Sequence, residues 1–154
     1  MKRLILLALF ISLVSVAAYG QTCTGSAAIM KHVYHPDRLQ EAKGCVTVKG
    51  IIKKKIKEGD GDFHIRLLLD NDQPDDLIND KNKTVQHGFL VFEPICVNKV
   101  TQQSAKKACK GYHQKISVPN VGDHVEVTGI HMLDTEHGWL EIHPVTKITV
   151  LPPE

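Results

Sequence analysis

The sequence contains few aromatic and few arginine side chains. Its 154 residues include one tryptophan, three tyrosines and four phenylalanines, and after residue 20 arginine occurs only at Arg38 and Arg66. The net charge of +2 comes from Lys2 and Arg3, because residues 1–20 hold no acid and the rest of the chain holds 17 residues of each sign. Such a balance lacks the basic excess that is typical of nucleic-acid-binding domains.

Several sequence signatures of enzymes and metal sites are also absent. The chain has no glycine-rich phosphate loop and no GxSxG motif, which argues against a P-loop nucleotide-binding protein and against an α/β-hydrolase. Its four cysteines do not form the closely spaced pairs of a four-cysteine zinc site. After residue 20, no apolar run is long enough to cross a membrane.

Residues 1–20 have the pattern of a secretory signal peptide. Two basic residues precede an apolar run, and Ala18 and Gly20 occupy the −3 and −1 positions of a cleavage site. A membrane anchor is the alternative, but about 15 apolar residues are fewer than the roughly 20 of a spanning helix. We expect a secreted or periplasmic protein without stable membrane insertion after cleavage, with an N-terminal arm at 21–43 and a β-barrel domain at 44–151.

All four cysteines follow the expected cleavage point. In an oxidising compartment, two disulfides are the default for such a chain. Of the three possible pairings we favour Cys96–Cys109, which closes a short segment, and Cys23–Cys45, which ties the N-terminal arm to the first strand.

Alternation of apolar and polar side chains predicts five β-strands. They span residues 45–57, 63–70, 87–96, 124–132 and 139–150. A turn at Asp60 and Gly61 joins the first two strands as an antiparallel hairpin, and Gly50 indicates a bulge or a sharp coil in the first strand. Residues 71–86, rich in Asp and Asn, predict a long loop, and residues 101–115 predict a helix.

The order of three strands, a helix and two strands predicts an all-β domain. It matches the oligonucleotide/oligosaccharide-binding (OB) fold, a five-stranded Greek-key β-barrel, here with one helix between strands three and four. An open sandwich made of strands alone is the alternative.

A mixed group of polar and aromatic side chains lies in the stretch DTEHGWLEIHP near the end of the chain. Residues two apart in a strand share a face, so Trp139, Glu141 and His143 point to one side while Leu140 and Ile142 point to the other. We expect the apolar pair in the core. The other three are then expected on the outer face of the barrel. A side chain as large and apolar as tryptophan is unusual there, which suggests a specific role for Trp139.

Imidazole and carboxylate groups are the ligands that zinc and similar divalent metals use outside thiolate sites. Glu141 and His143 supply two such groups from one strand, and His64 or His137 supplies a third. The hypothesis is a metal site formed by His64, Glu141 and His143, with zinc or a similar ion as cofactor. The alternative is that the turn acids and outward histidines are simply solvated.

Two motifs, DGD-x-H at residues 60–64 and HGW-x-EIHP at residues 137–144, resemble those of a family of small secreted prokaryotic proteins. The resemblance covers most of residues 30–150 and implies no particular activity. It implies that nine residues form one group: Glu58, Asp60, Asp62, His64, Glu93, His137, Trp139, Glu141 and His143. A weaker similarity to staphylococcal-type nucleases, which share the barrel and a DGD turn, ends at the arginines that those enzymes use to hold phosphate.

Two functional hypotheses from different classes follow. The first is a binding module for a small polar ligand, a glycan or a single-stranded nucleic acid. Its contacts come from Trp139, Arg66, Asp60, Asp62 and Glu93.

The alternative is a metal-dependent hydrolase, phosphodiesterase-like or nuclease-like, in which Glu58 and His137 transfer protons beside a metal-activated water. A third hypothesis is purely structural, with Trp139 packed over the N-terminal arm and the histidines capping the corner by hydrogen bonds. We favour binding, and the sequence does not decide whether the protein is an enzyme.

Overall fold

The structure is a computed structural model of the chain, and it describes residues 22–152. The expected signal peptide at 1–20 lies outside the described residues. Within them, no helix combines the length and the apolar character of a membrane-crossing segment.

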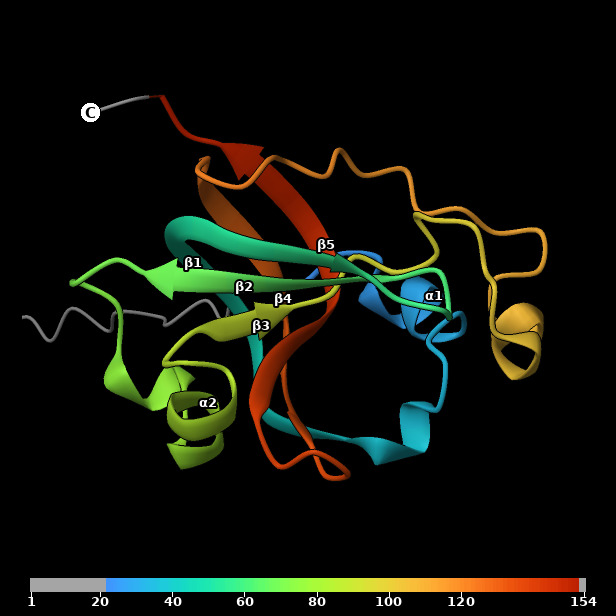
Figure 1. Ribbon diagram of the computed structural model, residues 1–154, viewed down its shortest axis with the longest axis horizontal. Coiled ribbons are helices and arrows are strands. Elements are labelled where there is room, and N and C mark those ends of the chain that lie inside the picture. Colours follow the sequence, from blue (N-terminus) through green and yellow to red (C-terminus); the bar gives the residue numbers. More distant parts are fainter. Residues whose placement is uncertain (1–21, 153–154) are drawn as a thin grey trace, which may run out of the picture.

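Five strands form one mixed sheet (Figure 1). They are β1 (Leu39–Lys57), β2 (Phe63–Leu69), β3 (Leu90–Phe92), β4 (His124–Asp134) and β5 (Leu140–Val150). The order β1-β2-β3-β5-β4 closes into a barrel because β4 also pairs with β1. All pairs are antiparallel except β3 with β5, which are parallel. The prediction of an all-β chain with five strands is confirmed.

The barrel interior is filled by the apolar side chains that alternation placed on one face of each strand. Its fully buried members include Ile52 of β1, Leu67 of β2, Phe92 of β3, Val127 of β4 and Ile142 of β5. Burying one side chain of this size contributes roughly 1.5–3 kcal/mol. The second face of each strand therefore points away from this core.

The first strand is longer than predicted. It begins at Leu39 rather than near residue 45, so part of the expected N-terminal arm is strand. Its irregularities lie between Glu41 and Gly44 and between Ile52 and Lys54. Gly50 is therefore not a bulge.

Gly50 instead marks a close approach of two strands. A Cβ added there would overlap the carbonyl oxygen of Leu68 on the neighbouring strand β2. Gly61, in the connection between the same strands, has φ +103°, which fits the predicted turn at Asp60 and Gly61.

Two predictions between β2 and β4 were wrong in part. The loop expected at 71–86 contains a short 3₁₀ helix and the α-helix α2 (Asp80–Val85), because Asn79 and Asn82 form a reciprocal capping box. The strand expected at 87–96 is only three residues long. His87 and Gly88 both have positive φ, which extended chain does not adopt.

The helix expected at 101–115 is also wrong. The segment holds only a 3₁₀ helix, η3 (Gln103–Lys107), and no α-helix among residues 101–115. Its first turn has no side-chain cap and no acidic residue. Three lysines crowd residues 106–110 without a compensating acid, so the helix formers there lack the capping and charge that a short helix needs.

An N-terminal cover, defined here as residues 22–38, lies against the outside of the barrel. It contains α1 (Ser26–Met30), which packs against β5, and the 3₁₀ helix η1 (Pro36–Arg38) (Figure 1). Val33 of the cover is buried in a second small apolar cluster with Ile95 and Cys96.

Both predicted disulfides are present. Cys23–Cys45 ties the N-terminal cover to β1, and Cys96–Cys109 closes the segment after β3. The two disulfides therefore fix segments that lie outside the barrel core.

Candidate functional site

A buried polar layer lies on the outer surface of the barrel wall. His64 on β2, Glu93 just after β3, and Glu141 and His143 on β5 all point away from the apolar core, and all are buried. Glu141 and His143 lie on the predicted outer face of the strand, but they are 0% and 1% exposed, so the alternative that such outward groups are simply solvated is wrong for these two. The N-terminal cover, whose helix α1 packs on β5, lies over the outer face of that strand, so side chains on this face are buried.

The buried groups form one chain of hydrogen bonds. Trp139 Nε1 donates to Glu141 Oε2 over 2.8 Å, and His143 Nδ1 lies 3.0 Å from Glu141 Oε1 and 3.2 Å from Glu93 Oε2. The other oxygen of Glu93, Oε1, is 2.9 Å from His64 Nδ1. Each histidine thus contacts the carboxylate of Glu93.

The chain ends at Gln86, which follows α2. Its Oε1 accepts a hydrogen bond from Arg66 Nε at 2.7 Å and lies 3.2 Å from His64 Nε2. Gln86 is buried and was not a predicted site residue. Its signal in the sequence is weak, because its place depends on the unpredicted helix α2.

Charge and burial oppose each other in this layer. Burial would lower the pKa of His143, but the hydrogen bonds with Glu141 and Glu93 raise it to about 10. Burial would raise the pKa of Glu93, but the two histidines hold it well below its usual value. The pKa of His64 is raised by Glu93 against the opposing effect of burial. Paired charges therefore occupy a site with little access to water.

Asp62, from the predicted DGD turn, is also buried. Its Oδ1 accepts the backbone N–H of Cys96 at 2.6 Å. Burial, followed by repulsion from Asp60, raises the pKa of Asp62 to about 7, and the Cys96 hydrogen bond only partly offsets this.

A second polar cluster holds the β4–β5 corner. The Oδ1 atom of Asp134 accepts the backbone N–H groups of Glu136 and His137, and its Oδ2 lies 2.9 Å from Arg38 Nη1 and 2.8 Å from His137 Nδ1. Asp134 and Arg38 were not predicted as site residues. The DTEHG turn sequence was the signal for Asp134, since an aspartate that starts such a turn accepts backbone N–H groups.

Trp139 is held between two histidines. Its ring stacks on His137 with centroids 4.4 Å apart and planes inclined by 10°, and His64 approaches it edge-on at 5.8 Å. With its N–H bonded to Glu141, the indole is fixed in place. One face of the ring is covered by His137, so a ligand can stack only on the remainder.

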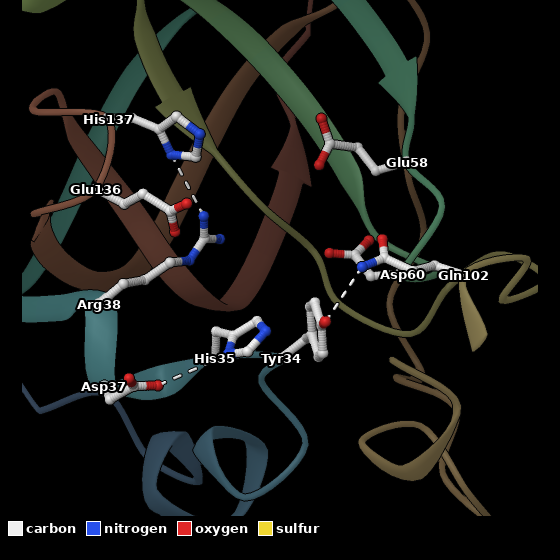
Figure 2. A pocket seen from close by; sticks show the side chains of 9 residues that line it. All are labelled: Tyr34, His35, Asp37, Arg38, Glu58, Asp60, Gln102, Glu136 and His137. Atoms are coloured by element: carbon white, nitrogen blue, oxygen red, sulfur yellow. Dashed lines mark hydrogen bonds and ion pairs between the residues drawn. The ribbon is translucent and has the colours of Figure 1, made fainter. Parts of the chain in front are cut away.

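Two hollows open above this layer. The inner hollow, about 340 Å³, is lined by Arg38, Glu58, His64, Arg66, Gln86, Glu93, His137, Trp139 and three neighbours. The outer hollow, about 420 Å³, is lined by Tyr34, His35, Asp37, Arg38, Glu58, Asp60, Gln102, Glu136 and His137. The two share Arg38, Glu58 and His137. Figure 2 shows Glu136, His137 and Arg38 facing Glu58 and Asp60 across the outer hollow.

No family model matches the chain. No curated protein matches it either. The resemblance carried by the two motifs therefore stays an expectation, and the geometry is the basis for a functional proposal.

Some of the side chains in this region could hold a metal ion. Asp62, Glu93 and His143 each bring one potential ligand atom within 4.8 Å of the other two. The predicted set of His64, Glu141 and His143 is not among the groupings of this kind in residues 22–152. The sulfur atoms that also approach Asp62 belong to the Cys96–Cys109 disulfide and offer no thiolate.

Proposed function

We propose that the protein is an OB-fold-like module, secreted or periplasmic, that binds a short uncharged glycan in the two joined hollows. The strand order and the closed sheet support the OB assignment. Proteins of that fold bind oligonucleotides and oligosaccharides on the face of strands 2 and 3, between the loops that follow strands 1 and 4. The two disulfides fit an oxidising compartment.

One observation carries this proposal: the hollows meet where those same loops converge. Glu58 comes from the β1–β2 connection, His137 from the β4–β5 connection, and both line the two hollows. His64 and Arg66 of β2 and Glu93 after β3 form the floor of the inner hollow. An OB fold presents its ligand face at this position, and this agreement supports the proposal.

The lining charges favour a glycan over a nucleic acid. Four of the nine residues of the outer hollow are acidic, against one arginine. A phosphate backbone would meet repulsion there, since nucleic-acid sites depend on basic groups. Carboxylate, amide and imidazole groups instead exchange hydrogen bonds with neutral hydroxyls.

The alternative of a metal-dependent hydrolase at His64, Glu141 and His143 has less support. The potential ligand atoms of that set are not among the groupings that come within 4.8 Å of one another in residues 22–152, and His64 Nδ1 is directed to Glu93. Proton transfer by Glu58 and His137 stays a prediction.

Glu58 provides the sharpest test. It is exposed at the junction of the two hollows, and its side chain makes no hydrogen bond with residues 22–152 in the structure. Glu58→Gln keeps the shape and removes the charge, so affinity for a neutral oligosaccharide should fall about tenfold, as for the loss of a charged hydrogen bond. Calorimetric titration against a panel of neutral oligosaccharides measures this.

Glu41→Gln is the matched control, because Glu41 is an exposed acid on β1 that lines neither hollow. The affinity of this variant for the neutral oligosaccharide should equal that of the wild type. Single-stranded DNA of similar length should bind weakly or not at all. Tight DNA binding with no glycan binding would overturn the proposal, as would an equal loss in both variants.

A further inference from the structure

The deepest part of the polar layer brings together three groups from distant parts of the chain. Asp62 comes from the β1–β2 connection, Glu93 follows β3 and His143 lies on β5. Their exposures are 3%, 4% and 1%, and one oxygen or nitrogen of each lies within 4.8 Å of the other two. Two carboxylates placed this close in a buried site repel each other. His143 and His64 offset the charge of Glu93, whereas burial and Asp60 keep the pKa of Asp62 raised.

A second observation points to a ligand. His143 Nε2 is buried and has no hydrogen-bond partner among the described residues. Buried ring nitrogens normally have a partner. The opposite nitrogen, Nδ1, is directed to Glu141 and Glu93, so Nε2 is the ring atom left with an electron pair when the imidazole is neutral.

The surroundings of His143 match those of a metal-bound histidine. Such a histidine usually donates its second ring N–H to a carboxylate, which is itself held by a further hydrogen bond. Here Glu141 Oε1 lies 3.0 Å from Nδ1, and Glu141 Oε2 accepts Trp139 Nε1–H at 2.8 Å. His64 Nδ1, at 2.9 Å from Glu93, would orient that carboxylate in the same way.

We propose that Asp62, Glu93 and His143 bind one divalent transition-metal ion, with zinc as the expected metal. One nitrogen and two carboxylate oxygens suit zinc, which binds His nitrogen and carboxylate oxygen at about 2.0–2.2 Å. Ligand atoms of a tetrahedral site lie roughly 3.3 Å apart, so the three ligand atoms, which lie within 4.8 Å of one another, would move closer together when the ion binds. The ion would join three segments beneath the inner hollow, and this site does not depend on the glycan.

The test measures zinc directly. Full-length protein, purified without an affinity tag or chelator, is analysed by elemental mass spectrometry and then titrated with zinc against a chromogenic chelator. We expect about one zinc per chain. Asp62→Asn should weaken zinc affinity at least tenfold, and it keeps an oxygen that accepts the Cys96 N–H. Glu141→Gln, which alters only the orienting carboxylate, should weaken it by roughly 10- to 100-fold.

Asp134→Asn is the control, because Asp134 is an equally buried acid that lies outside the trio. It should bind zinc with wild-type affinity. A zinc-dependent rise in melting temperature should occur in the wild type and in Asp134→Asn, but be reduced in Asp62→Asn. A folded wild type that binds neither zinc nor manganese overturns the proposal, and so does an equal loss of zinc in Asp62→Asn and Asp134→Asn.

Discussion

His131 is the one histidine of β4 that points into the apolar core. It is fully buried, its Nε2 lies 3.1 Å from the carbonyl oxygen of Leu77, and its Nδ1 has no hydrogen-bond partner among residues 22–152. Burial lowers its pKa, the Leu77 carbonyl opposes this, and the nearby charges of Lys43 and Asp76 act in opposite directions. The pKa of His131 is therefore lower in the folded protein than in the unfolded chain.

The lowered pKa of His131 predicts a loss of stability on acidification. Between about pH 6.5 and the lowered pKa of the folded protein, the unfolded chain binds a proton at this residue that the folded protein does not bind. The free energy of unfolding should therefore decrease as the pH falls, by at most about 1.4 kcal/mol per pH unit for one proton. In urea unfolding between pH 7.5 and pH 5, His131→Gln should show a smaller decrease than the wild type.

The raised pKa of His143 acts in the opposite sense. A histidine with a raised folded-state pKa contributes stability that is complete below about pH 6.5 and is lost as the pH rises through the folded value of about 10. The test therefore compares the slope of unfolding free energy against pH in the wild type with the slope in His131→Gln. Equal slopes over the acidic range would show that His131 does not titrate in this way.

At the residue scale, the sequence predicted the members of the polar layer better than their surroundings. The two-residue period placed Trp139, Glu141 and His143 on one face, and alternation placed Ile142 in the core. Their burial was not predictable, because it depends on how the N-terminal cover docks on β5. The pairing of Arg38 with Asp134 joins residues 96 positions apart and left no local pattern.

At the scale of elements, the crossing of β1 and β2 depends on Gly50. Gly50→Ala would place a methyl group against the Leu68 carbonyl oxygen, and backbone cannot move aside as a flexible side chain can. We expect a loss of about 3 kcal/mol, at the upper end for overpacking, measured by urea unfolding.

Gly59→Ala is the control for that substitution. A Cβ at Gly59 would meet only side-chain atoms of Thr101 and Gln102, at 3.4 Å or more. Its loss should stay below about 1 kcal/mol. Since the smaller entropy of the unfolded chain favours alanine at both positions, similar losses in the two variants would mean that the close approach at Gly50 does not set the cost.

The strands were predictable because alternation is a local signal, whereas the helices were not. The segment 101–115 is rich in helix formers but lacks a cap and acidic residues at its start. Residues 80–85 form α2 through two asparagines, Asn79 and Asn82, in place of the usual Ser/Thr and Glu pair. Composition alone predicted a helix at 101–115, which contains no α-helix, and a loop at 80–85, which forms α2.

At the scale of the whole molecule, the Cys23–Cys45 disulfide fastens the N-terminal cover over the polar layer. Replacing both cysteines by serine should reduce the free energy of unfolding by about 3 kcal/mol, typical for closing a loop of this length. Hydrogen exchange should accelerate in residues 22–38 and around Trp139 more than in the barrel core.

The double substitution at Cys96 and Cys109 is the comparison, because it opens a different segment. Its exchange should accelerate after β3 while residues 22–38 keep more of their protection. An unchanged cover in the Cys23–Cys45 variant would show that α1 packing alone holds it.

The parallel pairing of β3 with β5 sets the order in which the molecule can assemble. Val91 pairs with Glu141, about fifty residues later in the chain, and β5 is the strand that completes the barrel. Every earlier assembly is an open sheet with free edges, and contacts this distant in sequence slow folding to milliseconds or seconds. Because β5 also carries Glu141 and His143, barrel closure brings His143 to Glu93, which His64 of β2 contacts through its other oxygen. A chain that has not docked β5 correctly therefore leaves Glu93 with His64 as the one partner of these two histidines and leaves His143 without Glu93.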